Sequence, residues 1–317
     1  MRVRELREIG AAGDAVMNPL TRAAACLASS ACVVTQTTSG LIVGLLLFLV
    51  AAGLTLIFGV LKIVNFAHGT FYMLGAYIAY SVLRASDSYG LAVLAAGAAM
   101  AVFGIAFERL LIARVYGGNV LMQLLICYAV VLIFDDLVKM IWGADFHAMG
   151  MPDAFQRAPI FIAGGVVPPF YAGLIAISLC LAALLGLGLG LTRIGKIITA
   201  AADNPQMVSV LGVNTTALFA LVFGLGGGLA GLAGALAAPV RSLSPGMGFS
   251  ILIESFIITV IGGMGSIAGA LLAAIGIGLL RGFGTIGFPL FTDGLIYGAM
   301  ILVLLLRPSG LFGREMV

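Results

Sequence analysis

The chain alternates between long apolar stretches and short polar connections over most of its length. Nine such stretches occur, at residues 41–60, 66–83, 91–107, 120–141, 169–191, 217–240, 251–261, 268–280 and 290–306. A hydrocarbon core roughly 30 Å thick needs about 20 apolar residues per helical crossing, and a helix satisfies its backbone polar groups internally. With 62% hydrophobic and 9% charged residues, the sequence excludes a soluble globular enzyme and predicts an all-α polytopic membrane protein.

Two of the nine stretches differ from complete crossings. The stretch 66–83 contains His68 and several glycines, and the stretch 251–261 has only eleven residues. Irregular backbone is tolerated at membrane depth where it is buried in protein or lines a cavity. We therefore expect about eight transmembrane helices with one or two broken or re-entrant segments.

Basic residues in short loops indicate the cytoplasmic side. They mark three places: Arg109 with Arg114, Arg193 with Lys196, and Arg307 with Arg314. The connection 143–168 carries two aspartates, one arginine and three prolines, and we place it outside. We expect a multi-pass protein of the inner membrane with a cytoplasmic C-terminus. Strict alternation puts the N-terminus outside for nine crossings and inside for eight, so that end stays open.

The N-terminal part differs from the rest in composition. Residues 1–38 mix charges of both signs, and we expect an extension that is an interfacial helix, a disordered tail or sequence upstream of a misassigned start, with Met17 as the alternative start. Residues 39–313 form one transmembrane domain, and 314–317 a short tail. The four cysteines show no CxxC or Cys/His ligand spacing, so we expect small apolar side chains and neither a metal nor a cofactor.

One cytoplasmic connection is long enough to fold. Residues 192–202 predict a short helix that begins with the basic Arg193 and Lys196. Either Asp203 or Asn204 caps a second helix with Pro205 at its first position, and Gly212 fits just past its end. A helix–turn–helix on this face suits a membrane subunit that receives force from a soluble partner.

A few polar side chains fall within the apolar stretches. Asn65, His68 and Tyr72 are spaced by three and four residues, as on one helical face, and make a candidate translocation path; the alternative is that Asn65 and His68 cap a broken helix. Glu254 needs a cation or a cavity. Arg241 is one candidate partner for Glu254, and a role in the path is the alternative.

Two further patterns are typical of membrane helices. Asp135 and Lys139 form an i,i+4 pair beside Asp136 near a membrane edge marked by Trp142. Small residues spaced by four favour close helix packing. Four GxxxG patterns occur, at residues 186–190, 224–228, 227–231 and 265–269.

Five stretches of the chain together resemble one protein family. They are GLTLIFGVLKIVNFAHGTFYMLGAY at 53–77, FERLLIARVYGGN at 107–119, AAADNPQMVSVLGVN at 200–214, VIGGMGSIAGALLAAIGIGLL at 260–280 and LLRPSGLFG at 305–313. In this order they are similar to the membrane permeases of branched-chain amino acid ABC importers, closer to the H-type than to the M-type subunit. The resemblance extends from about residue 40 to residue 313.

The resemblance implies a transport subunit and not an enzyme. It implies partners besides membrane lipid: a second related permease, two ATP-binding-cassette ATPase subunits and an extracytoplasmic substrate-binding protein. The sequence holds no GxxxxGK[ST] phosphate loop, so ATP hydrolysis falls to another chain, and a net charge of +3 gives no reason for a nucleic-acid partner. The exact substrate stays open, because close relatives also carry urea or short amides.

A self-contained channel or secondary transporter is the alternative of a different class. Paired acidic residues in symmetric positions at the middle of the membrane would favour it, and the sequence lacks that pattern. An intramembrane enzyme needs a nucleophile–base pair or a metal motif such as HExxH. The two histidines, His68 and His147, have no such spacing.

Overall fold

The computed structural model describes residues 19–152 and 158–313, which form helices and one short hairpin. The α-helices are α2 (Pro19–Ala28), α3 (Ser30–Leu61), α4 (His68–Ser86), α5 (Tyr89–Leu110), α6 (Val120–Trp142), α7 (Pro169–Leu191), α8 (Arg193–Asp203), α9 (Pro205–Val210), α10 (Thr215–Ala237), α11 (Met247–Gly262), α12 (Ile267–Gly287) and α13 (Thr292–Leu306). Two 3-10 turns, η1 (Ile112–Val115) and η3 (Pro289–Phe291), and an antiparallel pair, β1 (Ile160–Ile162) with β2 (Gly165–Val167), complete the described chain. Met17 lies outside the described residues.

Six helical stretches of the described chain are long and apolar enough to cross a membrane. They are Ser30–Leu61, Tyr89–Val115, Pro169–Leu191, Thr215–Ala237, Ile267–Gly287 and Pro289–Leu306, and α11 is a shorter apolar helix. The prediction of an all-α polytopic membrane protein is confirmed. The number of about eight crossings stays a prediction, since α4 is more polar and α6 carries two aspartates and a lysine near its end.

The break between α3 and α4 runs from the surface into the protein. α3 ends at Leu61, the next residue Lys62 is exposed and has a left-handed backbone conformation with φ of 57°, and α4 begins at the fully buried His68. α3 itself begins at Ser30, so one continuous helix crosses the domain boundary expected at residue 38.

Glycine contacts hold α10 in the centre of the helix bundle. A Cβ on Gly75 of α4 would lie 2.5 Å from the Cα of Gly231 in α10, and a Cβ on Gly224 of α10 would lie 3.2 Å from the carbonyl oxygen of Ala101 in α5. Backbones this close leave no room for any side chain. The expected packing role is therefore confirmed for the two patterns in α10.

The pattern at 186–190 behaves differently. A Cβ on Gly186, Gly188 or Gly190 of α7 would meet nothing within 4 Å. The expectation that this pattern packs helices together is wrong for the described part of the subunit, because the stripe faces outward.

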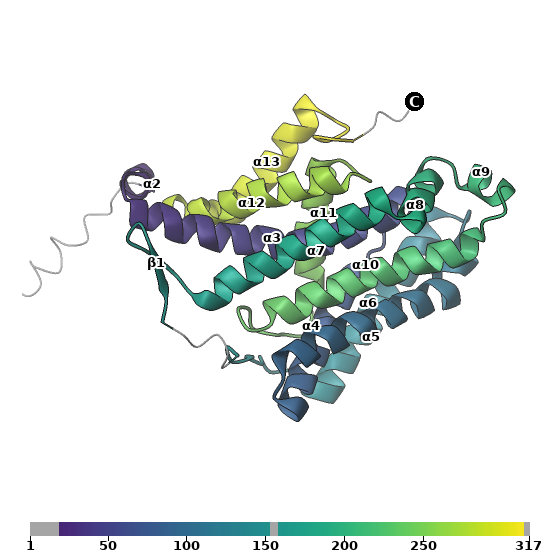
Figure 1. Ribbon diagram of the computed structural model, residues 1–317, viewed down its shortest axis with the longest axis horizontal. Coiled ribbons are helices and arrows are strands. Elements are labelled where there is room, and N and C mark those ends of the chain that lie inside the picture. The colour runs from purple at the N-terminus through teal and green to yellow at the C-terminus, as the bar shows by residue number, and fades with distance from the viewer. Residues whose placement is uncertain (1–18, 153–157, 314–317) are drawn as a thin grey trace, which may run out of the picture.

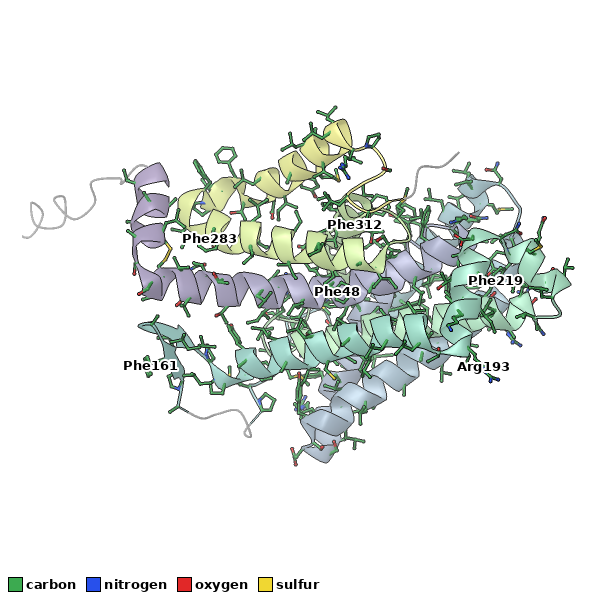
Figure 2. All side chains as sticks on the ribbon, turned by 45° about the horizontal axis from the view of Figure 1, so that its top comes forward. Phe48, Phe161, Arg193, Phe219, Phe283 and Phe312 are labelled. Atoms are coloured by element: carbon green, nitrogen blue, oxygen red, sulfur yellow. A yellow bond between two sulfur atoms is a disulfide. The ribbon has the colours of Figure 1, made fainter. Side chains whose placement is uncertain are left out.

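The two ends of the molecule carry different elements. Figure 1 shows α2 and β1 at one end and α8 with α9 at the other, and Figure 2 places Phe161 and Arg193 at these opposite ends. The hairpin is held to the start of α3, because the Ser30 hydroxyl donates a 2.8 Å hydrogen bond to the carbonyl of Ala163. The hairpin belongs to the connection 143–168, which the sequence predicts to lie outside. It lies at the same end of the molecule as the start of α3.

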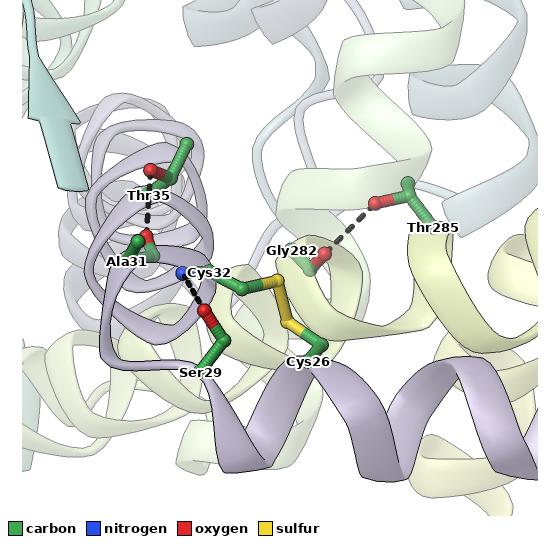
Figure 3. Close-up of a disulfide and its surroundings, with 7 residues drawn as sticks. All are labelled: Cys26, Ser29, Ala31, Cys32, Thr35, Gly282 and Thr285. Atoms are coloured by element: carbon green, nitrogen blue, oxygen red, sulfur yellow. Dashed lines mark hydrogen bonds between the residues drawn. A yellow bond between two sulfur atoms is a disulfide. The ribbon is translucent and has the colours of Figure 1, made fainter. Parts of the chain in front are cut away.

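A disulfide joins α2 to α3. Cys26 of α2 bonds to Cys32 of α3, and Figure 3 shows the pair beside Gly282 and Thr285 of α12. The expectation that all four cysteines act as small apolar side chains is wrong for this pair. Its six-residue separation matches no common motif, which is why spacing did not reveal it. Disulfides persist in the bacterial periplasm and are rare in the cytosol.

We expect the disulfide to protect both of its cysteines from a thiol reagent. Intact cells or outside-out vesicles treated with a membrane-impermeant maleimide should show no labelling at Cys26 or Cys32 before reduction, and labelling of both after it. Mass spectrometry of the purified chain checks the result. Labelling of both residues without prior reduction would contradict the disulfide. Labelling after reduction only when the reagent is on the cytoplasmic side would contradict an outer location for this end.

Candidate functional site

The helix pair α8–α9 is built by local capping groups. The Thr192 side chain accepts a hydrogen bond from the backbone N–H of Gly195 at 3.0 Å. The Asn204 side chain accepts one from Met207 at 3.0 Å, with Pro205 at the first position of α9. Both interactions satisfy N–H groups that a helix start leaves open. The two predicted short helices are confirmed, and of the two candidate caps it is Asn204 that begins α9.

Gly212 ends this pair as the spacing predicts. It has φ of +84°, the left-handed conformation that follows a helix end and favours glycine. A Cβ at Gly212 would meet nothing within 4 Å. Backbone conformation and not crowding within the subunit therefore favours glycine here.

The tip of α8–α9 presents apolar side chains to the exterior. Val208 is buried beneath the pair, whereas Val210 is 82% exposed and Leu211 78% exposed. The basic Arg193 and Lys196 are exposed on α8, and Asp203 is exposed at its end. Exposed apolar groups rimmed by polar ones mark interaction sites, so this tip has the character of a docking surface.

A buried hydrogen bond stiffens the neighbouring α5–α6 connection at the same end. The Tyr116 hydroxyl donates a 2.6 Å hydrogen bond to Oε1 of Glu108, which is fully buried. Burial, together with this bond, raises the pKa of Tyr116 far above its ordinary value. The hydroxyl therefore stays protonated and remains a donor.

A pocket lies in the other half of the molecule. It has a volume of about 140 Å³ and is lined by residues of α3, α4, α7, α10 and α11. Its polar lining residues are Ser39, Tyr72, Tyr171 and Arg241. Most of the remaining lining is aliphatic.

Glu254 contacts two arginines, one of which, Arg241, lines this pocket. Its Oε2 is 2.7 Å from Nη1 of Arg281 in α12 and 3.8 Å from Nη2 of Arg241. Arg281 also approaches Asp293 of α13 at 3.8 Å. The expected pairing of Glu254 with Arg241 is present, but the shorter contact is to Arg281. Arg281 directly follows the apolar stretch 268–280, and this single charged residue was the sequence signal for the second partner.

Asn65 and His68 lie apart from the pocket and hold the helix break. Oδ1 of Asn65 accepts the backbone N–H of Ala67 at 3.0 Å, and Nε2 of His68 is 3.1 Å from the carbonyl of Val50. Asn65 precedes α4, so the expected shared helical face holds only for His68 and Tyr72. Of the four candidate path residues, the structure brings Tyr72 and Glu254 together around Arg241.

The charged residues near the end of α6 pair differently from the expected i,i+4 contact. Lys139 contacts Asp136 at 2.8 Å, three residues away. Asp135 instead lies beside Gly246 in the α10–α11 connection, where a Cβ on Gly246 would be 3.9 Å from Oδ2 of Asp135. The expected pair is therefore replaced by one surface contact and one long-range contact.

The fold is that of a helical membrane protein with an internal pocket and an exposed apolar tip at α8–α9. Residues 36–305 match the family described as branched-chain amino acid transport system / permease component. The chain belongs to this family.

Curated relatives are similar over nearly their whole length. The high-affinity branched-chain amino acid transport system permease protein BraD of Pseudomonas aeruginosa is 32% identical over 295 residues, which covers 89% of this chain and 96% of that protein. The corresponding LivH protein of Escherichia coli is 27% identical over 300 residues, with the same coverage. A probable LivH protein of Methanocaldococcus jannaschii is 29% identical over 290 residues, 85% of this chain and 89% of its own. The expected closeness to the H-type subunit is confirmed. No solved structure is significantly similar to the chain.

Proposed function

We propose that this chain is a transmembrane permease subunit of an ATP-driven importer and forms part of the path for branched-chain amino acids. The observation that carries the proposal is the family match over residues 36–305, with relatives aligned end to end that are named as branched-chain amino acid permeases. The pocket suits an apolar side chain better than urea or a short amide, because seven of its eleven lining residues are aliphatic.

The two ends of the molecule are the proposed partner sites. We propose that the tip of α8–α9 docks on an ATP-binding-cassette ATPase, with two such subunits serving this chain and a second related permease. A substrate-binding protein delivers the amino acid at the opposite end. ATP hydrolysis then belongs to the ATPase subunits, and the exposed apolar tip supports the docking step.

The orientation proposed for the chain places α8, α9 and the C-terminus in the cytoplasm. Arg193 and Lys196 lie on α8, in agreement with the excess of basic residues on cytoplasmic loops. The disulfide at the start of α3 then lies on the oxidising side. Both observations support the same orientation from opposite ends of the molecule.

Reconstitution tests the function. Liposomes that hold this chain alone should show no ATP-dependent uptake of leucine, because the sequence has no nucleotide-binding loop. Addition of the second permease, the ATPases and the binding protein should restore uptake of radiolabelled leucine, and a Walker-lysine variant of the ATPase serves as the control. ATP-driven uptake by the isolated chain would contradict the proposal, as would a complete complex that fails to import leucine, isoleucine or valine.

A further inference from the structure

The pocket between α3, α4, α7, α10 and α11 combines an aliphatic wall with a polar edge. Ile42, Leu46 and Leu47 of α3 and Ile251 of α11 contribute to the wall. The volume of about 140 Å³ resembles that of an engineered cavity of roughly 150 Å³ that binds benzene. A four-carbon aliphatic side chain fits a space of this size.

At the polar edge of the pocket, Arg241 is the less closely paired of the two arginines that contact Glu254. Glu254 is satisfied by Arg281 at 2.7 Å, whereas Arg241 approaches the same oxygen only at 3.8 Å. Arg241 also lines the pocket, and its side chain is 35% exposed. A guanidinium offers five donors in a planar fork that matches a carboxylate. Arg241 therefore has donors free for an anionic group that enters the pocket.

The three charged side chains nearest the pocket carry a net charge of +1. Arg241 and Arg281 share the single charge of Glu254, and Arg281 is also 3.8 Å from the exposed carboxylate of Asp293. A carboxylate in the pocket gives Arg241 a second partner of opposite charge, while the amino acid as a zwitterion leaves the net charge of the site unchanged. Tyr72 lines the same pocket and offers its hydroxyl to the same carboxylate.

We propose that this pocket is a binding site for the transported amino acid within the permease, with the carboxylate on Arg241 and Tyr72, the ammonium facing Glu254, and the aliphatic side chain against α3 and α11. The inference rests on the proposed function and adds the residues that recognise the substrate. Several lining residues come from the first part of α3 and the end of α10, and the start of α3 lies at the end of the molecule away from α8–α9 (Figure 1). The pocket therefore receives the amino acid on the side from which a binding protein delivers it.

A thiol-protection experiment measures occupancy of the pocket without the binding protein. Ser39 lines the pocket, and Ser39→Cys is introduced together with Cys180→Ala, which removes the exposed free thiol. The complex of both permeases and the ATPases is labelled with a maleimide at increasing leucine concentrations. Leucine should slow labelling in a saturable way, and leucinamide, which lacks the carboxylate, should protect far less.

Arg241→Gln is the decisive variant. Loss of a charge-assisted contact should raise the half-protecting leucine concentration by roughly tenfold or more. Glu254 keeps Arg281 as its partner, so the variant retains a paired carboxylate. Arg84→Gln is the matched control, because it removes the same charge from an exposed position whose side chain contacts Tyr80. With Arg84→Gln, leucine should slow the labelling at the same concentrations as with the parent.

The outcomes separate this site from the proposed function. A complex that imports leucine but shows no protection at Ser39→Cys, or equal protection with Arg241→Gln and its parent, would overturn the site and leave the importer assignment intact. Equal protection by leucine and leucinamide would overturn the role of Arg241 in binding the carboxylate. A complex that imports no branched-chain amino acid would overturn the proposed function itself.

Discussion

Leu211→Asp is expected to abolish ATP-driven leucine uptake while the subunit still inserts into the membrane. Leu211 is 78% exposed at the tip of α8–α9, so the subunit loses no buried contact. An aspartate buried without a partner in an interface costs several kcal/mol, which corresponds to a loss of affinity on the order of a hundredfold or more. Co-purification of the ATPase with the tagged permease measures the effect.

Leu290→Asp is the matched control for this prediction. Leu290 is 93% exposed in η3, between α12 and α13, away from α8–α9. The same change of residue there should leave co-purification of the ATPase unchanged. Normal uptake and an intact complex with Leu211→Asp would show that α8–α9 is only a connection.

Gly212 gives a second, backbone-based readout of the same docking element. A Cβ in the left-handed region costs roughly 1–2 kcal/mol, and asparagine tolerates that region better than valine. Gly212→Val should therefore weaken ATPase association more than Gly212→Asn, since the added atoms meet open space within the subunit. Neither change should alter ligand binding by the separate substrate-binding protein. If both substitutions had an equal effect, the bulk of any added side chain would be the cause. That result would contradict the explanation by backbone conformation.

Gly234→Leu is expected to prevent the subunit from reaching its folded state. The Cβ of any side chain at Gly234 would overlap the carbonyl oxygen of Tyr72, and would lie 3.0 Å from the backbone nitrogen of Ala76. These are backbone atoms of α4, so relief requires that two packed helices move apart. Overpacking of a tight core typically costs 1–3 kcal/mol and sometimes more. The fraction of monodisperse protein in detergent and its thermal unfolding measure the loss.

Gly188→Leu is the control for this change. A Cβ at Gly188 of α7 would meet nothing within 4 Å, so the thermal unfolding of the subunit should not change. A folded Gly234→Leu protein with the melting temperature of its parent would contradict the close packing of α4 against α10.

The α8–α9 pair shows how far the sequence alone determined this protein. Thr192, Asn204, Pro205 and Gly212 act on their own helix ends, through hydrogen bonds and backbone angles that span at most a few residues. Such local effects are visible in the residue order. The same holds for the membrane-spanning class, because an apolar helix of sufficient length has few alternatives to the bilayer.

Only the tertiary structure decided which distant residues meet. Glu254 and Arg281 lie 27 residues apart on two helices, and their contact depends on how each helix is rotated, which packing over the whole interface sets. The GxxxG patterns of α7 and α10 share one spacing, yet Gly186 faces open space and Gly231 packs against Gly75 of α4. The spacing of residues along a helix determines which of them share a face. Which neighbouring helix that face contacts depends on the sum of all contacts in the folded chain.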